Sequence, residues 1–362
     1  NVDPCAGAQT PAQVTNANPL NPNLADPNFV AVCLAQGAPV GQIGVIENPT
    51  SGQANITTGG SLLLGPEKAN TWTVGAVIRP RFLPGLSATI DYYNIKVNRA
   101  ITLPTPDDLI GACFNNITAA SATSLACTII RRNAGSGSLD GDPLEVPGLF
   151  GILSNRGKIT TDGIDVTLDY RRNIGSIMGA PAKLAINFGG NWTRSQKFQA
   201  VDGVSLNREC VGYYSANCGF PGGQLLPKIT FNQRTTLSLG RVDLSLLWRY
   251  IGKMRYEPGL DPLFSGTIVS TPGHPLIGVP GTLNGETVNF NRIPAKHYFD
   301  FTTRFNVNEH FDLTFTVMNL FDKDPPNVGN SAGSTTANGG NTFPALYDPL
   351  GRRFAASARI KF

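Results

Sequence analysis

The last twelve residues, "GRRFAASARIKF" (351–362), alternate apolar and polar side chains along most of their length. Successive side chains of an extended strand point to opposite faces, so this period of two predicts a strand with one apolar and one polar face. Ala355 is neutral to the pattern. The apolar positions are Phe354, Ala356, Ala358, Ile360 and Phe362, and the polar ones are Arg353, Ser357, Arg359 and Lys361.

Eight earlier segments show the same alternation, and each has about the ten residues of a tilted membrane strand. The fifth of them is the weakest, because Gln233 and Thr235 fall on its apolar face. The eight segments are 68–79, 86–97, 162–171, 183–193, 229–239, 242–251, 299–307 and 311–320. With the terminal stretch, the sequence predicts an all-β chain of eight or nine strands.

Alternation of this kind also occurs in soluble β-sandwiches, which bury one face of each strand. Three features favour a transmembrane antiparallel β-barrel. The segments exceed the usual soluble strand of about five or six residues. Aromatic residues sit at the ends of the apolar faces, as in an interfacial girdle. These girdle candidates are Trp72, Tyr92, Tyr170, Trp192, Tyr250 and Phe362.

The connections between the segments alternate in length, which is the third feature. Short connections precede Leu86, Lys183, Val242 and Phe311. The long connections are 98–161, 197–228, 252–297 and 319–351. Outer-membrane barrels have short periplasmic turns and long extracellular loops. We therefore expect residues 68–362 to form barrel with long extracellular loops, and residues 1–67 to form a loop region with few strands.

Composition narrows the function classes. Charged residues make up 15% of the 362 residues, below the value of about 25% for soluble domains. The net charge of +4 comes from scattered Lys and Arg without a basic cluster, which argues against a nucleic-acid partner. No apolar run reaches the roughly 18 residues of a membrane helix. Because the chain starts at Asn1 without a leader, we expect a processed or incomplete product.

The six cysteines all fall in long connections or in the leading segment, two in each. Pairing within segments gives Cys5–Cys33, Cys113–Cys127 and Cys210–Cys218, although six cysteines permit fifteen connectivities. Disulfides imply an oxidising compartment. Buried free thiols and a metal site are the alternatives, and the lack of CxxC spacing or a nearby His–Cys cluster argues against a metal.

Four stretches together carry a family resemblance: "PEKANTWTVGAVIRPRFLPGLSATIDYYNIKV", "RGKITTDGIDVTLDY", "VMNLFDKDPP" and "YDPLGRRFAASARIKF". They resemble the C-terminal part of TonB-dependent outer-membrane receptors, and "NLFDK" (319–323) and the "GRRF…F" ending are the most specific pieces. The resemblance covers the chain from about residue 65 onward.

That resemblance implies the bacterial outer membrane and a 22-stranded barrel filled by an N-terminal plug. In this family TonB grips a segment of the plug and relays the proton-motive force. This chain contains neither the plug nor a TonB-binding segment, so the remaining strands and the plug are expected partners, on a second chain or on a missing N-terminal part. Outer-membrane lipid is the other expected partner. The terminal aromatic resembles the signal read by the barrel-assembly machinery.

No catalytic motif and no cofactor or metal site is predicted. His274, His297 and His310 are far apart and are interpreted as solvated loop residues, and "LDGDPLE" around Asp140, Asp142 and Glu145 is interpreted as a polar turn rather than a calcium site. Charged residues on the polar faces are expected to line the lumen or contact the plug: Asp91, Asp165, Arg171, Arg249, Asp300, Arg304 and Arg359. Loop aromatics are candidates for first ligand capture: Phe150, Tyr213, Tyr214, Phe220 and Phe264.

The sequence thus predicts part of a receptor that imports a scarce nutrient, such as a siderophore complex, a vitamin, a saccharide or a peptide. A passive porin-like or structural barrel is the alternative. A secreted all-β enzyme with paired carboxylates is a third reading.

Overall fold

The computed structural model describes residues 3–7, 22–201, 208–214, 225–257, 268–269, 287–288, 292–328 and 342–360. The chain divides into two compact units. Unit 1 comprises Asn1–Asn70, Lys96–Thr160 and Lys197–Arg208, and unit 2 comprises Thr71–Ile95, Thr161–Gln196 and Glu209–Phe362. Every helix in the described part of the chain is too short or too polar to span a bilayer.

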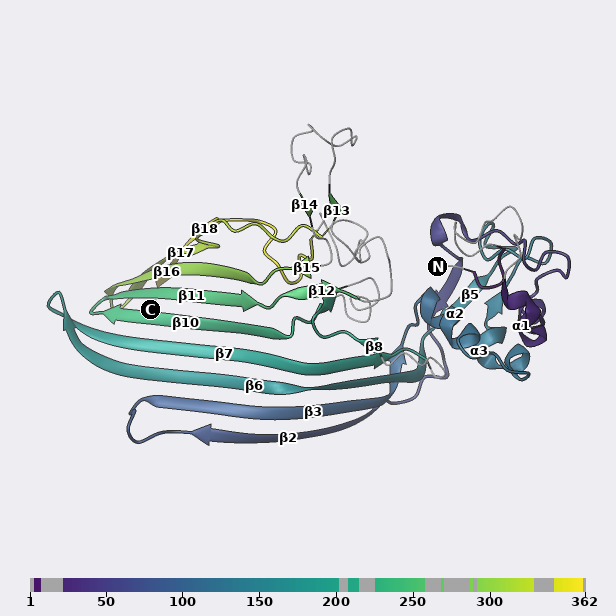
Figure 1. Ribbon diagram of the computed structural model, residues 1–362. Helices are drawn as coiled ribbons and strands as arrows, with labels where there is room; N and C mark the ends of the chain where they lie inside the picture. Colours follow the sequence, from purple (N-terminus) through teal and green to yellow (C-terminus); the bar gives the residue numbers. More distant parts are fainter. Residues whose placement is uncertain are drawn as a thin grey trace, which may run out of the picture. The chain divides into compact units, whose positions relative to one another are not determined.

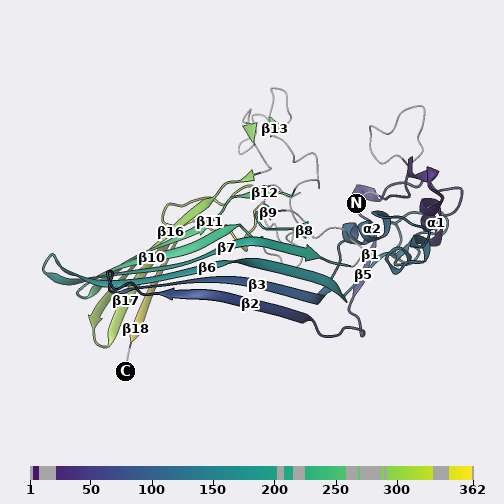
Figure 2. The ribbon, with the colours of Figure 1, turned by 60° about the horizontal axis from the view of Figure 1, so that its bottom comes forward.

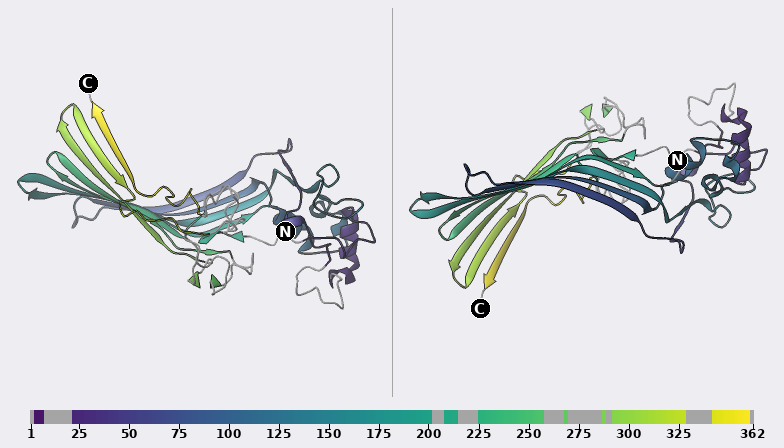
Figure 3. Two further views of the ribbon diagram at one scale, coloured as in Figure 1. Left: turned by 90° about the horizontal axis from the view of Figure 1, so that it is seen from above. Right: turned by 90° about the horizontal axis from the view of Figure 1, so that it is seen from below.

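Nine long strands form one continuous sheet, in the order β18-β17-β16-β11-β10-β7-β6-β3-β2 (Figure 1). In sequence order they are β2 (Lys68–Ile78), β3 (Leu86–Thr102), β6 (Ser154–Ile177), β7 (Ala180–Gln199), β10 (Ile229–Leu239), β11 (Val242–Ile251), β16 (Lys296–Asn308), β17 (Phe311–Met318) and β18 (Arg353–Ile360). Figures 2 and 3 show these strands as a single curved and twisted layer. All nine predicted strands are confirmed.

The strand register sorts the side chains as the alternation predicts. One row across the sheet pairs Leu246 with Phe301, Phe301 with Val317 and Val317 with Phe354. A parallel row pairs Asp243 with Arg304 and Arg304 with Thr314, so it is polar. Antiparallel neighbours share a face at each paired position. The sheet therefore has an apolar face and a polar face.

The apolar face is open rather than covered. Val74, Phe315 and Phe354 are 65%, 46% and 75% exposed. Within the described residues the other sheets are small, and none is a second layer that shields this face. A soluble sandwich buries its apolar face between two sheets. The exposed face therefore contradicts a sandwich and agrees with a barrel wall.

Gln233 and Thr235, the two polar residues that weakened the fifth predicted strand, lie on the apolar face of β10. Register pairs Gln233 with Phe188 and Trp248, and Thr235 with Leu246. The Gln233 Nε2 amide donates to the Thr235 hydroxyl at 2.6 Å. Because each polar group satisfies part of the other's hydrogen-bonding capacity, the pair costs less in an apolar surrounding than two isolated groups.

Connection lengths follow the predicted alternation. The short connections 79–85, 178–179, 240–241 and 309–310 lie at one end of the sheet (left in Figure 1), called the turn end here. The opposite end is called the loop end. Three strands in particular run farther than the alternation predicts, because β3 has 17 residues, β6 has 24 and β7 has 20. About ten residues cross a bilayer. All three strands continue beyond the periodic segment toward the loop end, and β6 and β7 also continue toward the turn end.

Smaller elements fill the long connections. The helices are α1 (Pro27–Ala35), α2 (Pro106–Phe114) and α3 (Leu125–Thr128), with 3₁₀ turns at Pro22–Ala25, Thr50–Gly52 and Ser121–Thr123. The short strands are β1 (Ile56–Gly59), β4 (Ile130–Arg131), β5 (Gly148–Ile152), β8 (Arg208–Glu209), β9 (Tyr213–Tyr214), β12 (Met254–Tyr256), β13 (Ile268–Val269), β14 (Thr287–Val288) and β15 (Arg292–Ile293). β8 pairs with β7 at the margin of the large sheet, and the other short strands form the sheets β1-β5-β4, β15-β12-β9 and β13-β14.

The three α-helices of the described part of the chain belong to unit 1. Pro106 opens α2, where Thr105 and Asp108 form a reciprocal capping box. Its cores are built from Val32, Leu109, Ile130 and Leu149 and from Phe29 with Ile46. Disulfides join Cys5 to Cys33 and Cys113 to Cys127, so two of the three predicted pairs are present. The third includes Cys218, which lies outside the described residues.

Candidate functional site

A charged network occupies the loop end of the polar face. Arg249 on β11 forms a bidentate pair with Asp300 on β16, with Nε–Oδ2 and Nη2–Oδ1 distances of 3.0 Å each. Planar guanidinium and carboxylate groups fit each other in this fork geometry. Asp300 also accepts a hydrogen bond from the Asn319 backbone N–H at 2.8 Å. The pair therefore ties β11 and β16 to the end of β17.

Asp348, in the connection before β18, extends this network. Its Oδ2 lies 2.8 Å from Arg353 Nη2 and 3.8 Å from Arg249 Nη2. The Arg249 guanidinium carbon also lies 5.2 Å from the centre of the Tyr298 ring. Two arginines and two aspartates are thus neighbours on the polar face, and their formal charges cancel. Because the opposite charges are paired, the free-energy cost of burying them partly is reduced.

The "NLFDK" motif forms the turn that ends β17. Asn319 is fully buried and has a positive φ of 51°. Its Oδ1 accepts from Lys323 N at 2.8 Å, and its Nδ2 donates to Lys323 O at 3.0 Å. Asp322 accepts from the Arg352 N–H at 2.8 Å. Asparagine tolerates the left-handed conformation and bonds locally to backbone, which explains this residue at this position.

A cavity of about 670 Å³ lies beside this network. Its polar wall comes from β6, β7, β10 and β11, and Leu346 of the last connection also contributes. Asn191 holds one side, because its Nδ2 donates to Asp165 Oδ1 at 2.7 Å and to the Tyr93 hydroxyl at 3.1 Å. The polar lining residues are Asp165, Thr167, Asn191, Thr230, Asn232 and Arg249.

Tyr92, Asp162 and Arg194 form a second charged group in unit 2. The Tyr92 hydroxyl donates to Asp162 Oδ2 at 3.0 Å, and the Arg194 Nε–H donates to the same oxygen. Asp162 is buried, whereas the Arg194 side chain is 59% exposed. Both donors satisfy a carboxylate that would otherwise be costly to bury. This group crosses from β3 to β6 and β7.

The structure brings together only some of the charged residues expected on the polar face. Asp165 and Arg249 line the cavity, and Asp300 pairs with Arg249. Arg304 forms an ion pair with Asp243 at 2.5 Å. The remaining three lie elsewhere: Asp91 lies against Gly75 of β2, Arg171 lies next to the turn-end residue Gly85, and Arg359 faces Asp312 across the β17–β18 register.

The candidate capture aromatics have different environments. Phe150 is half-buried in β5 of unit 1, and Tyr213 is half-buried in β9. Tyr214 is fully buried in a hydrophobic cluster with Met254, Phe343 and Tyr347. Phe220 and Phe264 lie outside the described residues. The structure thus gives Tyr214 a packing role, and burial raises the pKa of its hydroxyl.

Sequence reasoning missed Asn191, Asn232, Thr167 and Asp348. The first three are uncharged and alternate like any other residue of a polar face. Asp348 carried a signal, because it belongs to the "YDPLGRR" stretch of the family resemblance. His297 also differs from its expected place in a solvated loop: it is the second residue of β16 and accepts from Trp248 Nε1 at 3.1 Å on the apolar face.

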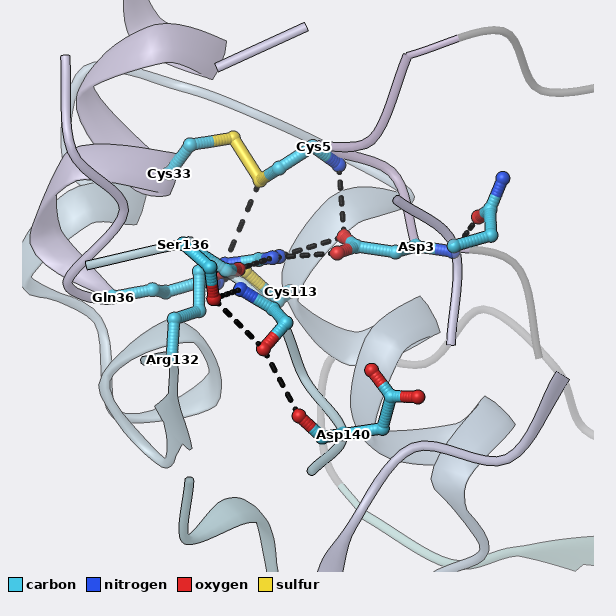
Figure 4. Close-up of polar contacts among 11 residues, drawn as sticks. Asp3, Cys5, Cys33, Gln36, Cys113, Arg132, Ser136 and Asp140 are labelled. Atoms are coloured by element: carbon cyan, nitrogen blue, oxygen red, sulfur yellow. Dashed lines mark hydrogen bonds and ion pairs between the residues drawn. A yellow bond between two sulfur atoms is a disulfide. The ribbon is translucent and has the colours of Figure 1, made fainter. Parts of the chain in front are cut away.

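Unit 1 has its own buried polar cluster (Figure 4). Arg132 forms a bidentate ion pair with Asp3, with distances of 2.6 and 2.7 Å, and both side chains are fully buried. Gln36 Oε1 accepts from Arg132 Nε at 2.9 Å. This cluster joins residues about 130 positions apart. Its charges and hydrogen-bonding groups satisfy one another, so the cluster has a structural role: it holds distant segments of unit 1 together.

The acidic stretch 139–145 also has local partners. Asp140 Oδ2 accepts from Thr50 N at 2.7 Å, and Asp142 Oδ1 accepts from Leu144 N at 2.9 Å. Glu145 Oε2 accepts from Asn133 Nδ2 at 3.3 Å. The three carboxylates thus have separate hydrogen-bonding partners in the loop rather than sharing one centre.

Three solved structures that resemble this chain are distant from it in sequence. The ferric enterobactin receptor from Pseudomonas aeruginosa is 16% identical, with a TM-score of 0.44 over 82% of this chain and 31% of that one. The FrpB iron transporter from Neisseria meningitidis is 12% identical, with a TM-score of 0.44, covering 82% and 31%. The ferric yersiniabactin uptake receptor from Yersinia pestis is 12% identical, with a TM-score of 0.38, covering 82% and 30%.

This chain therefore spans about a third of the length of these proteins. No curated protein matches the sequence. The family model for the TonB dependent receptor-like β-barrel matches residues 15–320, which is most of the chain. Members of this family are outer-membrane transporters and receptors with a plug that interacts with TonB. Because this family model matches most of the sequence, and the long antiparallel strands agree with it, the chain belongs to the TonB-dependent receptor β-barrel family.

Proposed function

We propose that this chain forms the C-terminal part of the barrel wall of an outer-membrane receptor. The receptor imports a scarce, bulky nutrient with energy relayed by TonB. The observation that carries the proposal is the cavity beside the Arg249–Asp300 pair, whose hydrogen-bonding groups lie on the face opposite the exposed apolar face. In a plugged barrel, that polar face lines the lumen through which the ligand passes.

The open sheet supports a larger assembly. In the described sheet, β2 and β18 each have a neighbour on one side only. Each unpaired backbone group in hydrocarbon costs several kcal/mol, so a membrane-spanning sheet must close on itself. Further strands therefore complete the barrel between β18 and β2, and the plug fills it. By family membership, TonB acts on that plug rather than on this chain.

The lining of the cavity defines the ligand class. Amides of Asn191 and Asn232, the Thr167 hydroxyl and the Asp165 carboxylate offer both donors and acceptors. Arg249 is already paired with Asp300, so the wall has little unbalanced charge. Phe231, Tyr250, Ile251 and Leu346 give the same cavity a larger apolar surface. The lining therefore suits a ligand that combines hydrogen-bonding groups with apolar parts. Siderophore complexes, cobalamin, saccharides and peptides all meet this description, and the loops and plug select among them.

Ligand binding by the polar wall is tested best at Asn232. Its side chain lines the cavity, and it has no hydrogen-bond partner among the described residues, so Asn232→Ala removes one recognition group without breaking the wall. We expect a loss of affinity of about five- to tenfold, the equivalent of about 1 kcal/mol for one hydrogen bond. The assay is calorimetric titration of the purified receptor with a panel of iron–siderophore complexes, cobalamin, oligosaccharides and peptides.

Asn306→Ala is the matched control, because Asn306 lies on the polar face of β16 away from the cavity and faces Asp312. We expect its affinity to stay within about twofold of the wild-type value. Equal losses for the two variants, or no loss for Asn232→Ala, would contradict a recognition role for this cavity.

Energy coupling is tested separately in whole cells. Uptake of the bound ligand should stop when a protonophore collapses the proton gradient or when TonB is deleted, while surface binding persists. Uptake that continues at the same rate without the gradient would favour the passive porin-like alternative instead.

A further inference from the structure

Two adjoining hollows lie on the apolar face at the loop end of unit 2. The first is an apolar groove of about 330 Å³ between β6, β7 and β10, called the groove here. Ile164, Val166, Phe188, Trp192 and Phe231 form most of its apolar walls. The second is a pocket of about 490 Å³, called the upper pocket here because it lies nearer the loop end. Ile229 lines both hollows, so they adjoin at this residue.

The groove exists because Gly190 has no side chain. A Cβ at this position would lie 2.9 Å from the Phe188 ring and 3.2 Å from Phe231 Cβ, so the neighbouring rings already close the space around it. The centroids of these two rings are 5.4 Å apart. A slot with aromatic and β-branched walls fits a flexible hydrocarbon chain, because dispersion contacts on both sides replace contacts with mobile lipid.

The upper pocket is basic. Lys228, Lys253 and Arg255 line it, and the described lining residues include no carboxylate. Met254, the first residue of β12, is fully buried in the hydrophobic cluster of Tyr214, so alternation places its neighbours Lys253 and Arg255 outward. Within the described residues, none of the three cationic side chains is in an ion pair.

The order of the two hollows follows the chain. Phe231 of the groove stacks on Tyr250 of the basic pocket, with ring centroids 4.7 Å apart. Tyr250 is the penultimate residue of β11, and β12 with its cations follows immediately. The basic pocket therefore lies just past the end of the membrane strand, and the apolar groove lies along it. An aromatic belt marks this boundary in outer-membrane barrels.

We propose that the two hollows form one binding site for an anionic, phosphoryl-bearing lipid of the outer leaflet. One acyl chain occupies the groove over Gly190, and the phosphoryl group lies between Lys253 and Arg255. The site requires the membrane placement given above as the proposed function. Charge complementarity selects the lipid, since each Lys or Arg near the membrane surface strengthens binding of anionic lipid by about fivefold.

The test is native mass spectrometry of the intact receptor in mild detergent. Apparent dissociation constants are measured for phosphatidic acid, phosphatidylcholine and diacylglycerol with identical acyl chains. We expect the wild type to bind phosphatidic acid about 25-fold more tightly than the other two, which is about fivefold for each of the two cations. Lys253→Glu with Arg255→Glu should abolish that preference. The control, Arg131→Glu with Lys158→Glu, changes exposed cations of unit 1 by the same net charge and should leave the preference intact.

Two further arms separate the acyl chain from the phosphoryl group. Gly190→Leu fills the groove and should weaken phosphatidic acid binding without affecting heat-modifiable folding. Inorganic phosphate at constant ionic strength should fail to displace the lipid, whereas displacement would show a simple anion pocket and overturn the proposal. The charge reversal concerns exposed side chains, so it decides the question even if Gly190→Leu prevents folding.

Insertion into phosphatidylcholine nanodiscs separates this proposal from the one on which it rests. Receptor that does not insert contradicts the membrane placement itself. Receptor that inserts but binds the three lipids equally, or keeps its preference after the charge reversal at Lys253 and Arg255, contradicts the lipid site alone.

Discussion

Substitution of Asp3 by asparagine is expected to destabilise unit 1 strongly. Asp3 accepts two hydrogen bonds from Arg132, at 2.6 and 2.7 Å, and neither side chain has any solvent exposure. Asp3→Asn keeps the shape but leaves the Arg132 charge buried without a counter-ion. Removing one partner of a buried pair costs about 3–5 kcal/mol. We expect about 3 kcal/mol here, because Gln36 and Gly137 still accept from the guanidinium.

Native-state hydrogen exchange measures this loss at amides buried within unit 1. Suitable reporters are Arg132 N–H, which donates to Gln36 O at 2.9 Å, and Leu149 N–H, which donates to Asn55 O at 2.8 Å. Small domains are stable by about 5–15 kcal/mol. A loss of about 3 kcal/mol corresponds to exchange that is faster by about two orders of magnitude when the unit opens as a whole.

Two matched variants make the experiment specific. Asp142→Asn changes an exposed carboxylate that caps the Leu144 N–H, and its effect should stay below about 1 kcal/mol. Replacing both members of the buried pair, by Asp3→Asn with Arg132→Met, should recover part of the loss because no unpaired charge remains. If the reporter amides of Asp3→Asn exchange at rates within a factor of about five of the wild-type rates, this account of the Asp3–Arg132 pair is refuted.

Three other outcomes are expected. Asn319→Ala should destabilise the connection after β17 by about 2–3 kcal/mol, because it removes two hydrogen bonds and places a Cβ-bearing residue without local side-chain bonds at a positive φ. Asn319→Gly should destabilise it by about 1 kcal/mol less, since glycine tolerates that φ. The measurement is protease sensitivity of this connection, and equal sensitivity of the two variants would exclude a contribution of φ. Burial raises the pKa of the Tyr347 hydroxyl, so the stability that it provides below pH 10 is lost as pH rises past the unfolded-state value. That hydroxyl lacks a hydrogen-bond partner among the described residues, so Tyr347→Phe should unfold at higher pH than wild type, and an unchanged alkaline midpoint would contradict this reading. Reduction of the two disulfides of unit 1 should lower the stability of that unit by about 3 kcal/mol for each disulfide. The backbone amides of β10 and β11 should stay protected in the same hydrogen-exchange experiment. Loss of their protection would show that the two units do not unfold separately.

Much of the sheet could be predicted from sequence because its physical cause is local. A strand that separates two environments must alternate, and the alternation survives even where Gln233 and Thr235 interrupt it. The ends of β6 and β7 were underestimated for the same reason. Once a strand leaves the membrane, its outward face no longer has to be apolar, and the period disappears.

The interior of unit 1 could not be predicted in this way. Its core and its Asp3–Arg132 pair join residues from distant segments with no shared period. Nor did the sequence reveal that Tyr214 is buried, because its cluster combines β9, β12 and the last connection. For the cavity, Asp165, Arg249 and Asp300 were placed on the polar faces, but the pairing of Arg249 with Asp300 depends on register, which alternation alone does not fix.

The most direct measurement of the central claim is spin-label accessibility along β11. Single labels at each position from 243 to 248 are compared in bilayers by collision with oxygen, which concentrates in lipid, and with a water-soluble nickel complex. The sorting of faces predicts high oxygen accessibility at Leu244, Leu246 and Trp248, and high nickel accessibility, or protection by the plug, at Asp243, Ser245 and Leu247. Uniform accessibility along the strand, or oxygen maxima at the odd positions, would contradict a sheet whose apolar face meets lipid.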